Sequence, residues 1–125
     1  FQPQRTKDDW ICSDESVVDA YQADPLCGFD PTIGLARDLL TGVQMNERPE
    51  NLAKMDKTLP VLFISGSKDP VGAMSKGVLA CIDAFKRNGL RNISIKLYPN
   101  DRHEVLNEQN KDEVYQDVLS WLEAH

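Results

Sequence analysis

The sequence predicts an α/β fold in which one helix connects two parallel strands. Residues 61–64 form a continuous apolar run of β-forming side chains, which is typical of a strand covered on both faces. Residues 75–88 have a helical apolar repeat, and residues 93–98 alternate between apolar and polar side chains. Strand, helix and strand within about forty residues form a βαβ unit, so we expect a right-handed crossover.

The first part of the chain, residues 1–57, is expected to be helical and irregular. Ser13 is positioned to cap a short helix that ends at Asp24-Pro25. Asp30-Pro31 supplies a cap and a first helical residue for a second helix, and Pro49 begins a short third one. The second helix has an apolar stripe of Ile33, Leu35, Ala36, Leu39, Leu40 and Val43. With Leu26 and Phe29, some of these could line an acyl-chain pocket, although ordinary helix packing explains them more simply.

The remaining residues, 58–125, contain the βαβ unit and a last helix. The crossover helix is expected to turn Val78, Leu79, Ile82 and Phe85 inward and to end at Gly89. In the second strand, Ile93, Ile95 and Leu97 are expected on the buried face, with Ser94, Lys96 and Tyr98 on the other. The last helix begins at Asn110, with Glu113 completing a capping box. Its predicted buried stripe is Val114, Val118, Leu119 and Leu122. The two helices could share one face of the sheet or cover both.

Composition restricts the function. The 125 residues suit one ordinary domain, and the net charge of −6 disfavours nucleic-acid binding. No apolar run approaches the ~20 residues of a membrane-spanning helix, so we expect no stable membrane insertion. We see no secretory signal, and three unpaired cysteines, an odd number, indicate a reducing, cytoplasmic compartment. His103 and His125 lack spaced partner ligands and no glycine loop resembles a phosphate cradle, so we expect no metal and no cofactor.

Two polar residues follow the two predicted strands. Asp69 lies just after the first strand and His103 just after the second. Because ligands bind beyond the carboxyl ends of parallel strands, both side chains are expected at one edge of the sheet. A carboxylate that accepts a hydrogen bond from Nδ1–H of a histidine leaves Nε2 free to take a proton from a nucleophile. An Asp before a Pro is also a common turn residue, and a His among charged neighbours is often simply solvated.

The amino-acid sequences of these loops resemble those of a known family. Residues 66–72 (Gly-Ser-Lys-Asp-Pro-Val-Gly) and 102–108 (Arg-His-Glu-Val-Leu-Asn-Glu) resemble the C-terminal half of α/β-hydrolase-fold serine hydrolases, in the monoacylglycerol lipase and lysophospholipase-like branch related to serine aminopeptidases. Residues 5–28 resemble the end of that branch's lid region, through Arg5-Thr6, Trp10, Ser13-Asp14, Val18, Tyr21 and Asp24-Pro25-Leu26-Cys27.

The resemblance covers residues 5–28 and 58–125 and implies roles for both parts of the chain. Asp69 would be the triad acid and His103 the general base. Residues 1–57 would be a helical lid or cap segment, and residues 58–125 a C-terminal βαβα portion of the α/β-hydrolase core.

The chain departs from that family in one major respect. No G-x-S-x-G nucleophile elbow is present, and Ser65 and Ser67 lack the strand–turn–helix context of one. The oxyanion hole, built partly from the amide after the nucleophile, should be absent too. We therefore expect a C-terminal part of a hydrolase that is inactive alone. Its open edge along residues 61–64 would pair with the missing N-terminal part or with a second copy.

The expected function is that of a serine ester hydrolase acting on a small-molecule ester or lipid, such as a lysophospholipid or monoacylglycerol. One alternative is an aminopeptidase-like peptidase of the same fold. Another is a non-catalytic α/β interaction module, in which Asp69 and His103 would lie apart. Glu104 and Glu108 could tune the histidine, but are expected as a solvated loop residue and a solvated residue before the last helix.

Overall fold

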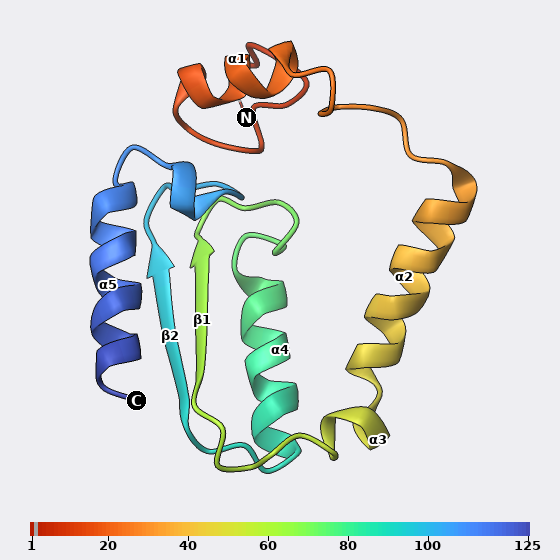
Figure 1. Cartoon of the computed structure of the whole chain (residues 1–125), viewed down its shortest axis with the longest axis vertical. Coiled ribbons are helices and arrows are strands. Elements are labelled where there is room, and N and C mark those ends of the chain that lie inside the picture. Colours follow the sequence, from red (N-terminus) through yellow and green to blue (C-terminus); the bar gives the residue numbers. More distant parts are fainter. Residues whose placement is uncertain (2) are drawn as a thin grey trace.

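A computed structural model describes residue 1 and residues 3–125, arranged as Figure 1 shows. Strands β1 (Val61–Gly66) and β2 (Ile93–Tyr98) are parallel, and helix α4 (Lys76–Arg87) joins them. Their register runs from Val61 opposite Ile93 to Gly66 opposite Tyr98. The predicted βαβ unit is confirmed, and both strands end at the same edge of the sheet.

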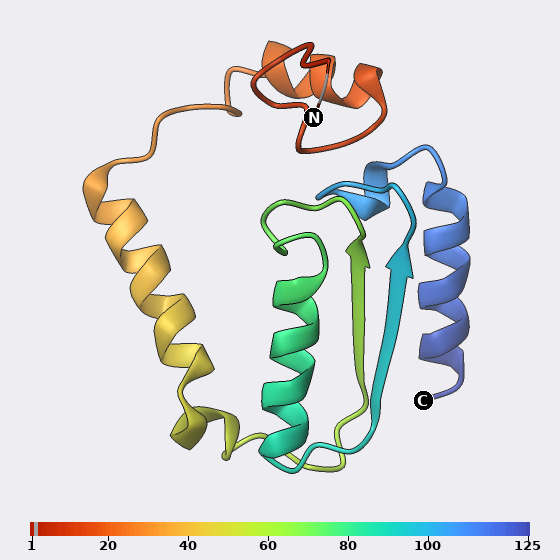
Figure 2. The same ribbon diagram turned by 180° about the vertical axis from the view of Figure 1, so that it is seen from behind.

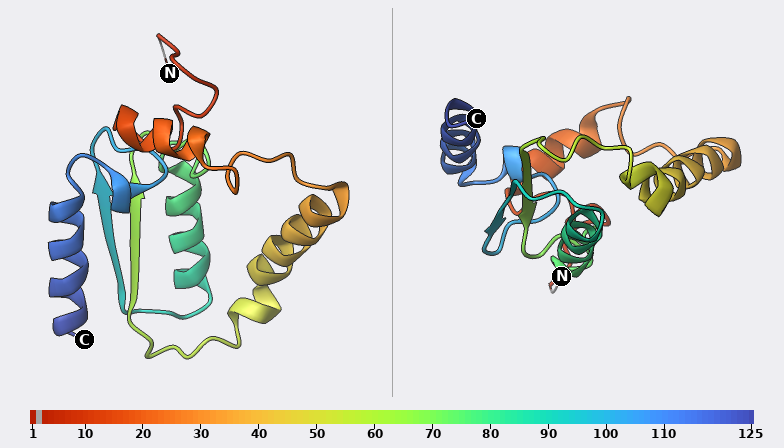
Figure 3. Two further views of the ribbon diagram at one scale, coloured as in Figure 1. Left: turned by 45° about the horizontal axis from the view of Figure 1, so that its top comes forward. Right: turned by 90° about the horizontal axis from the view of Figure 1, so that it is seen from below.

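Helices α4 and α5 (Lys111–Glu123) cover opposite faces of the sheet. The ring of Phe63 in β1 packs edge-on against Phe85 of α4, with centroids 5.3 Å apart. Ser94 of β2 accepts a hydrogen bond from the Trp121 indole of α5 at 3.2 Å. Phe63 pairs with Ile95, the neighbour of Ser94, and successive side chains of a strand point to opposite faces. The sheet is therefore the middle layer of three (Figures 1 and 3).

The first part of the chain contains α1 (Glu15–Ala23), α2 (Ile33–Glu47) and α3 (Pro49–Leu52). Helix α1 lies across the carboxyl ends of the strands, whereas α2 stands apart from the sheet (Figures 1 and 2). No residue of α2 is buried, so its apolar stripe neither packs against the core nor lines an enclosed acyl-chain pocket. An open groove of about 800 Å³ separates α2 and α3 from α4, and neither Asp69 nor His103 lines it.

The capping of α1, α2 and α5 differs from the prediction, whereas α3 begins at Pro49 as predicted. Asp14, not Ser13, caps α1 by accepting the amide of Ser16 at 2.9 Å, because the Ser13 side chain bonds elsewhere. Thr32 caps α2, accepting the amide of Leu35 at 3.1 Å. At α5 the amide of Glu113 bonds the main-chain oxygen of Asn110 at 2.9 Å, without the predicted side-chain capping.

Most of the buried apolar residues that the structure describes form two small clusters. One joins Tyr98, Val105 and Val114 with Ile64, between the sheet and α5. The other lies beneath α1 and consists of Ile11, Cys12 and Val18, with Trp10, Val17 and Tyr21 packed against it. The short 3-10 helix η1 (Val105–Asn107) brings Val105 into the first cluster.

Several burial predictions were wrong. Leu79 and Ile95, for example, were expected to face inward but are 47% and 43% exposed. Tyr98, expected on the solvated face of its strand, is 0% exposed because α5 covers that face, and its hydroxyl donates to Asp117 at 3.0 Å. Burial raises the pKa of Tyr98 well above its ordinary value. Leu119 and Leu122, expected to be buried, are 47% and 59% exposed. Neither lies on the side of α5 that contacts the sheet.

Candidate active site

Asp69 is held by the loop that follows β1. One of its carboxylate oxygens accepts the main-chain N–H of Val71 at 2.8 Å, and its own carbonyl accepts that of Met74 at 2.8 Å. Asp69 is only 7% exposed. Residues 73–75 then turn through positive φ angles of 51°, 53° and 71°, which returns the chain into α4. The loop thus fixes a buried carboxylate at the carboxyl end of the sheet.

His103 comes to the same edge from the loop after β2. Its Nδ1 lies 3.1 Å from the second carboxylate oxygen of Asp69, Oδ2. The imidazole side chain is 40% exposed, whereas that of Asp69 is 9% exposed. A ring held through one nitrogen and partly open to solvent can exchange protons at the other nitrogen. The two predicted site residues therefore meet, unlike the separated pair expected for an interaction module.

Gly66 allows the two loops to approach each other this closely. A Cβ atom at this position would lie 2.1 Å from the carbonyl oxygen of Arg102 and 2.3 Å from that of Asp101. Both atoms belong to the main chain next to His103. A side chain at residue 66 would therefore displace the loop that holds the imidazole.

Trp10 contacts His103 directly, a contact that sequence reasoning did not predict. The amide of His103 donates to the carbonyl of Trp10 at 3.3 Å, and the amide of Glu104 donates to that of Ile11 at 2.8 Å. The indole and imidazole rings lie 5.2 Å apart at 47°. The N-terminal segment of residues 9–13 thus lies against the histidine loop.

Glu108 joins the same two segments and is buried, at 1% exposed, contrary to the expected solvation. Its Oε1 accepts the amides of Ser13 at 2.9 Å and Arg102 at 2.8 Å. Its Oε2 accepts the hydroxyl of Ser13. A Glu shortly before a helix normally suggests an exposed residue, so no local pattern distinguished it.

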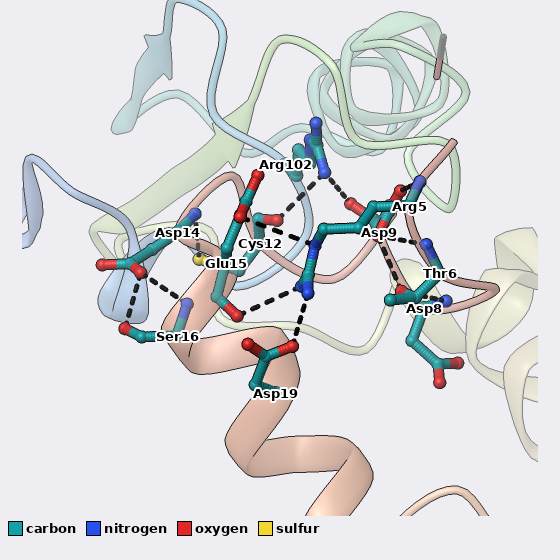
Figure 4. Close-up of polar contacts among 10 residues, drawn as sticks. All are labelled: Arg5, Thr6, Asp8, Asp9, Cys12, Asp14, Glu15, Ser16, Asp19 and Arg102. Atoms are coloured by element: carbon teal, nitrogen blue, oxygen red, sulfur yellow. Dashed lines mark hydrogen bonds and ion pairs between the residues drawn. The ribbon is translucent and has the colours of Figure 1, made fainter. Parts of the chain in front are cut away.

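A network of ions and main-chain groups organises residues 5–19 (Figure 4). Arg102 donates to the carbonyls of Asp9 and of Cys12, the latter at 3.1 Å. The Asp9 carboxylate accepts the amides of Arg5 at 2.7 Å and Thr6 at 3.0 Å. The Thr6 hydroxyl, followed by these amides, lowers the pKa of Asp9 to about 2. This network holds the segment that contacts the histidine.

Ser65 and Ser67 make other hydrogen bonds. The hydroxyl of Ser65, buried in β1, donates to the carbonyl of Gly66 at 3.3 Å. The hydroxyl of Ser67 accepts the amide of Asn100 at 2.9 Å. Each supports the loops around the site, and neither lies on a strand–turn–helix elbow.

The sequence profile of the serine aminopeptidase S33 family matches residues 1–110. The chain belongs to this hydrolase family. A monoacylglycerol lipase of Mycolicibacterium smegmatis is 35% identical over 120 residues, which are 94% of this chain and 39% of that protein. The family predicted from residues 66–72 and 102–108 is confirmed.

Solved structures agree with this membership in the hydrolase family. A thermostable carboxyl esterase of Bacillus coagulans, in complex with glycerol, superposes with a TM-score of 0.83 at 32% identity, over 99% of this chain and 41% of that one. A lipase in an open form gives 0.77 at 28% identity, over 94% and 39%. The predicted α/β-hydrolase fold is thus confirmed, and this hydrolase chain spans about two fifths of the length of these relatives. None of the helices described for residues 1 and 3–125 is long and apolar enough to cross a membrane.

Proposed function

We propose that Asp69 and His103 are the acid and the general base of a serine ester hydrolase. The observation that supports this proposal is the 3.1 Å contact between Nδ1 of His103 and Oδ2 of Asp69 at the carboxyl end of the sheet. The carboxylate would hold the tautomer with the proton on Nδ1 and would stabilise the imidazolium that forms during reaction.

The reaction is acyl transfer in two steps. His103 Nε2 takes the proton of a serine hydroxyl as the serine oxygen bonds to the ester carbonyl carbon, and the imidazolium then returns that proton to the departing alcohol. Water repeats the sequence on the acyl-enzyme, giving the carboxylic acid and free serine. We place the serine and the oxyanion hole outside residues 1–125, so this chain alone is expected to be inactive.

The first part of the chain would serve as a cap. We propose that residues 1–57 belong to the lid of the hydrolase, because α1 lies across the strand ends where substrate would enter, and α2 exposes an apolar stripe. The free edge of β1 and this stripe would be covered by further hydrolase chain or by a second copy. Light scattering that finds a thermally stable monomer of 125 residues would contradict this part of the proposal.

The substrate is proposed to be a small-molecule ester or lipid, with monoacylglycerols and lysophospholipids favoured. The similarity to a monoacylglycerol lipase and to an esterase with bound glycerol supports this class. Because the matching family is described as serine aminopeptidase, peptide hydrolysis is the second candidate. We also propose a reducing, cytoplasmic location, since Cys12, Cys27 and Cys81 are all free thiols.

Intact mass measured together with fluorophosphonate labelling tests the proposal. Protein from its natural source is expected to be larger than 14.1 kDa and to be labelled, whereas the 125-residue chain is expected to remain unlabelled. Labelling of the 125-residue chain would show that a serine within it is reactive, and would overturn the external nucleophile. A panel of monoacylglycerols, lysophospholipids and aminoacyl amides on the labelled form then separates ester from peptide hydrolysis.

A further inference from the structure

We propose that Glu108 is a positioning residue for His103, which holds the histidine loop against the N-terminal segment of residues 9–13. This inference rests on the proposed role of His103 as general base. It assigns Glu108 no contact with substrate. Its effect would pass through the main chain immediately before the imidazole and through the segment of residues 9–13.

The contacts of Glu108 join segments that are far apart in sequence. One carboxylate oxygen accepts the amide of Arg102, the residue immediately before His103, at 2.8 Å. The same oxygen accepts the amide of Ser13 at 2.9 Å, across 95 residues of chain, and the other oxygen accepts the Ser13 hydroxyl. One side chain thereby fixes the main chain beside the base to the segment that contains Trp10.

Arg102 adds further hydrogen bonds between the same two segments. While its amide binds Glu108, its guanidinium donates to the carbonyls of Asp9 and Cys12 (Figure 4). The Trp10 carbonyl between them accepts the amide of His103 at 3.3 Å. Consequently the main chain of residues 102–104 and that of residues 9–13 cannot shift independently.

The burial of Glu108 indicates that its hydrogen bonds to the two segments hold it in this position. A carboxylate at 1% exposure is strongly disfavoured unless hydrogen bonds compensate for lost hydration, and here both oxygens accept. Hydrogen bonds to an ionised acceptor are shorter and stronger than neutral ones. Removing the carboxylate would leave the two amides and the Ser13 hydroxyl without this acceptor, and the histidine loop would relax away from Asp69.

Two substitutions of different severity test the role. Glu108→Gln keeps the length of the side chain and one carbonyl acceptor but loses the charge, whereas Glu108→Ala removes every acceptor. Glu104→Gln is the matched control, because Glu104 is adjacent to His103 yet its carboxylate bonds only the side chain of Asn107, at 2.7 Å, among the described residues. Far-UV circular dichroism is used to confirm that each variant is folded.

The first readout needs no activity. In protein labelled with ¹⁵N-histidine, the Nδ1–H proton bound to Asp69 should give a downfield resonance, identified by its loss in His103→Ala. Glu108→Gln is expected to weaken this resonance and the nuclear Overhauser contact between the indole of Trp10 and the imidazole, whereas Glu104→Gln should leave both unchanged. Folded Glu108→Gln with a wild-type resonance and contact would overturn the inference.

The second readout is ester hydrolysis by the protein at its native length. Misplacement of a catalytic group by about 1 Å can cost about 100-fold in rate, so we expect kcat to fall about 100-fold in Glu108→Ala. Loss of charge alone should reduce it about tenfold in Glu108→Gln, with KM within about twofold of wild type in both. If Glu108→Ala does not fold, Glu108→Gln decides the outcome.

The two proposals fail in different ways. Full activity of His103→Ala would refute the proposed function, whatever Glu108 does. Loss of activity in His103→Ala, combined with wild-type kcat in folded Glu108→Gln, would refute only the positioning role.

Discussion

Oδ2 of Asp69 lies 3.1 Å from Nδ1 of His103, while Oδ1 of the same carboxylate accepts the main-chain N–H of Val71 at 2.8 Å. The main chain therefore holds the carboxylate through one oxygen, and the carboxylate orients the histidine through the other. This division of its two oxygens explains how a loop residue can present one defined lone pair to the imidazole. It also makes the site sensitive to a change of a single atom.

Asp69→Asn should reduce ester hydrolysis by about 10⁴-fold at native chain length. The amide oxygen can still accept from Val71, so the new NH₂ group faces His103 and favours the tautomer without a proton on Nδ1. Stability should change little. Asp83→Asn, at an exposed position of α4, is the control, and kcat measured beside thermal unfolding checks the prediction. Near-wild-type kcat in Asp69→Asn would exclude the acid–base role.

Gly66→Ala should destabilise the fold, because the new methyl group would overlap two main-chain carbonyl oxygens of the histidine loop. Overpacking costs about 1–3 kcal/mol where neighbours can move, and backbone cannot move easily, so we expect at least the upper part of this range. Gly42→Ala in α2 meets nothing within 4 Å and should instead stabilise by about 0.5–1 kcal/mol. Urea unfolding of both variants compares them, and equal midpoints would contradict the prediction.

Acid should loosen the N-terminal segment through Asp9. Its pKa is lowered from 3.8 to about 2, so its contribution to stability is present above pH 4 and is lost as the pH falls from about 4 to about 2. In Asp9→Asn this part of the pH dependence of the free energy of unfolding should disappear. Urea melts between pH 2 and pH 5 measure it, with Asp83→Asn as the control. An unchanged pH profile in Asp9→Asn would contradict the assignment.

Cys12 should resist thiol reagents in the folded protein. It is 1% exposed, and burial raises its pKa from 9.0 to about 11, so about one thiol in a thousand is ionised at pH 8. Cys27 and Cys81 are half-buried and should react first. Mass spectrometry after timed alkylation follows each site, with unfolded protein as the reference. Modification of Cys12 at the rate of the other two would contradict this.

The local sequence was sufficient to predict most helices and strands, and to predict that Asp69 and His103 lie close together. Apolar runs and repeats follow the strand and helix periods, and the carboxyl ends of two parallel strands must lie at one edge. Helix caps were less predictable, because several residues near one start can cap and a distant partner can engage one of them. Ser13 illustrates this, since its side chain bonds Glu108 and leaves the cap to Asp14.

Only the tertiary structure decided which face of the sheet each helix covers and which polar residues are buried. The burial of Tyr98 depends on α5 lying over a face that looked solvated. Glu108 is buried because a segment 95 residues away supplies its hydrogen-bond donors. Local periodicity indicates the direction in which each side chain points from its strand or helix. Burial and hydrogen bonding depend on which distant segments pack against that side chain. For this protein the local sequence determined that Asp69 and His103 lie close together, and long-range packing determined what holds the two residues in position.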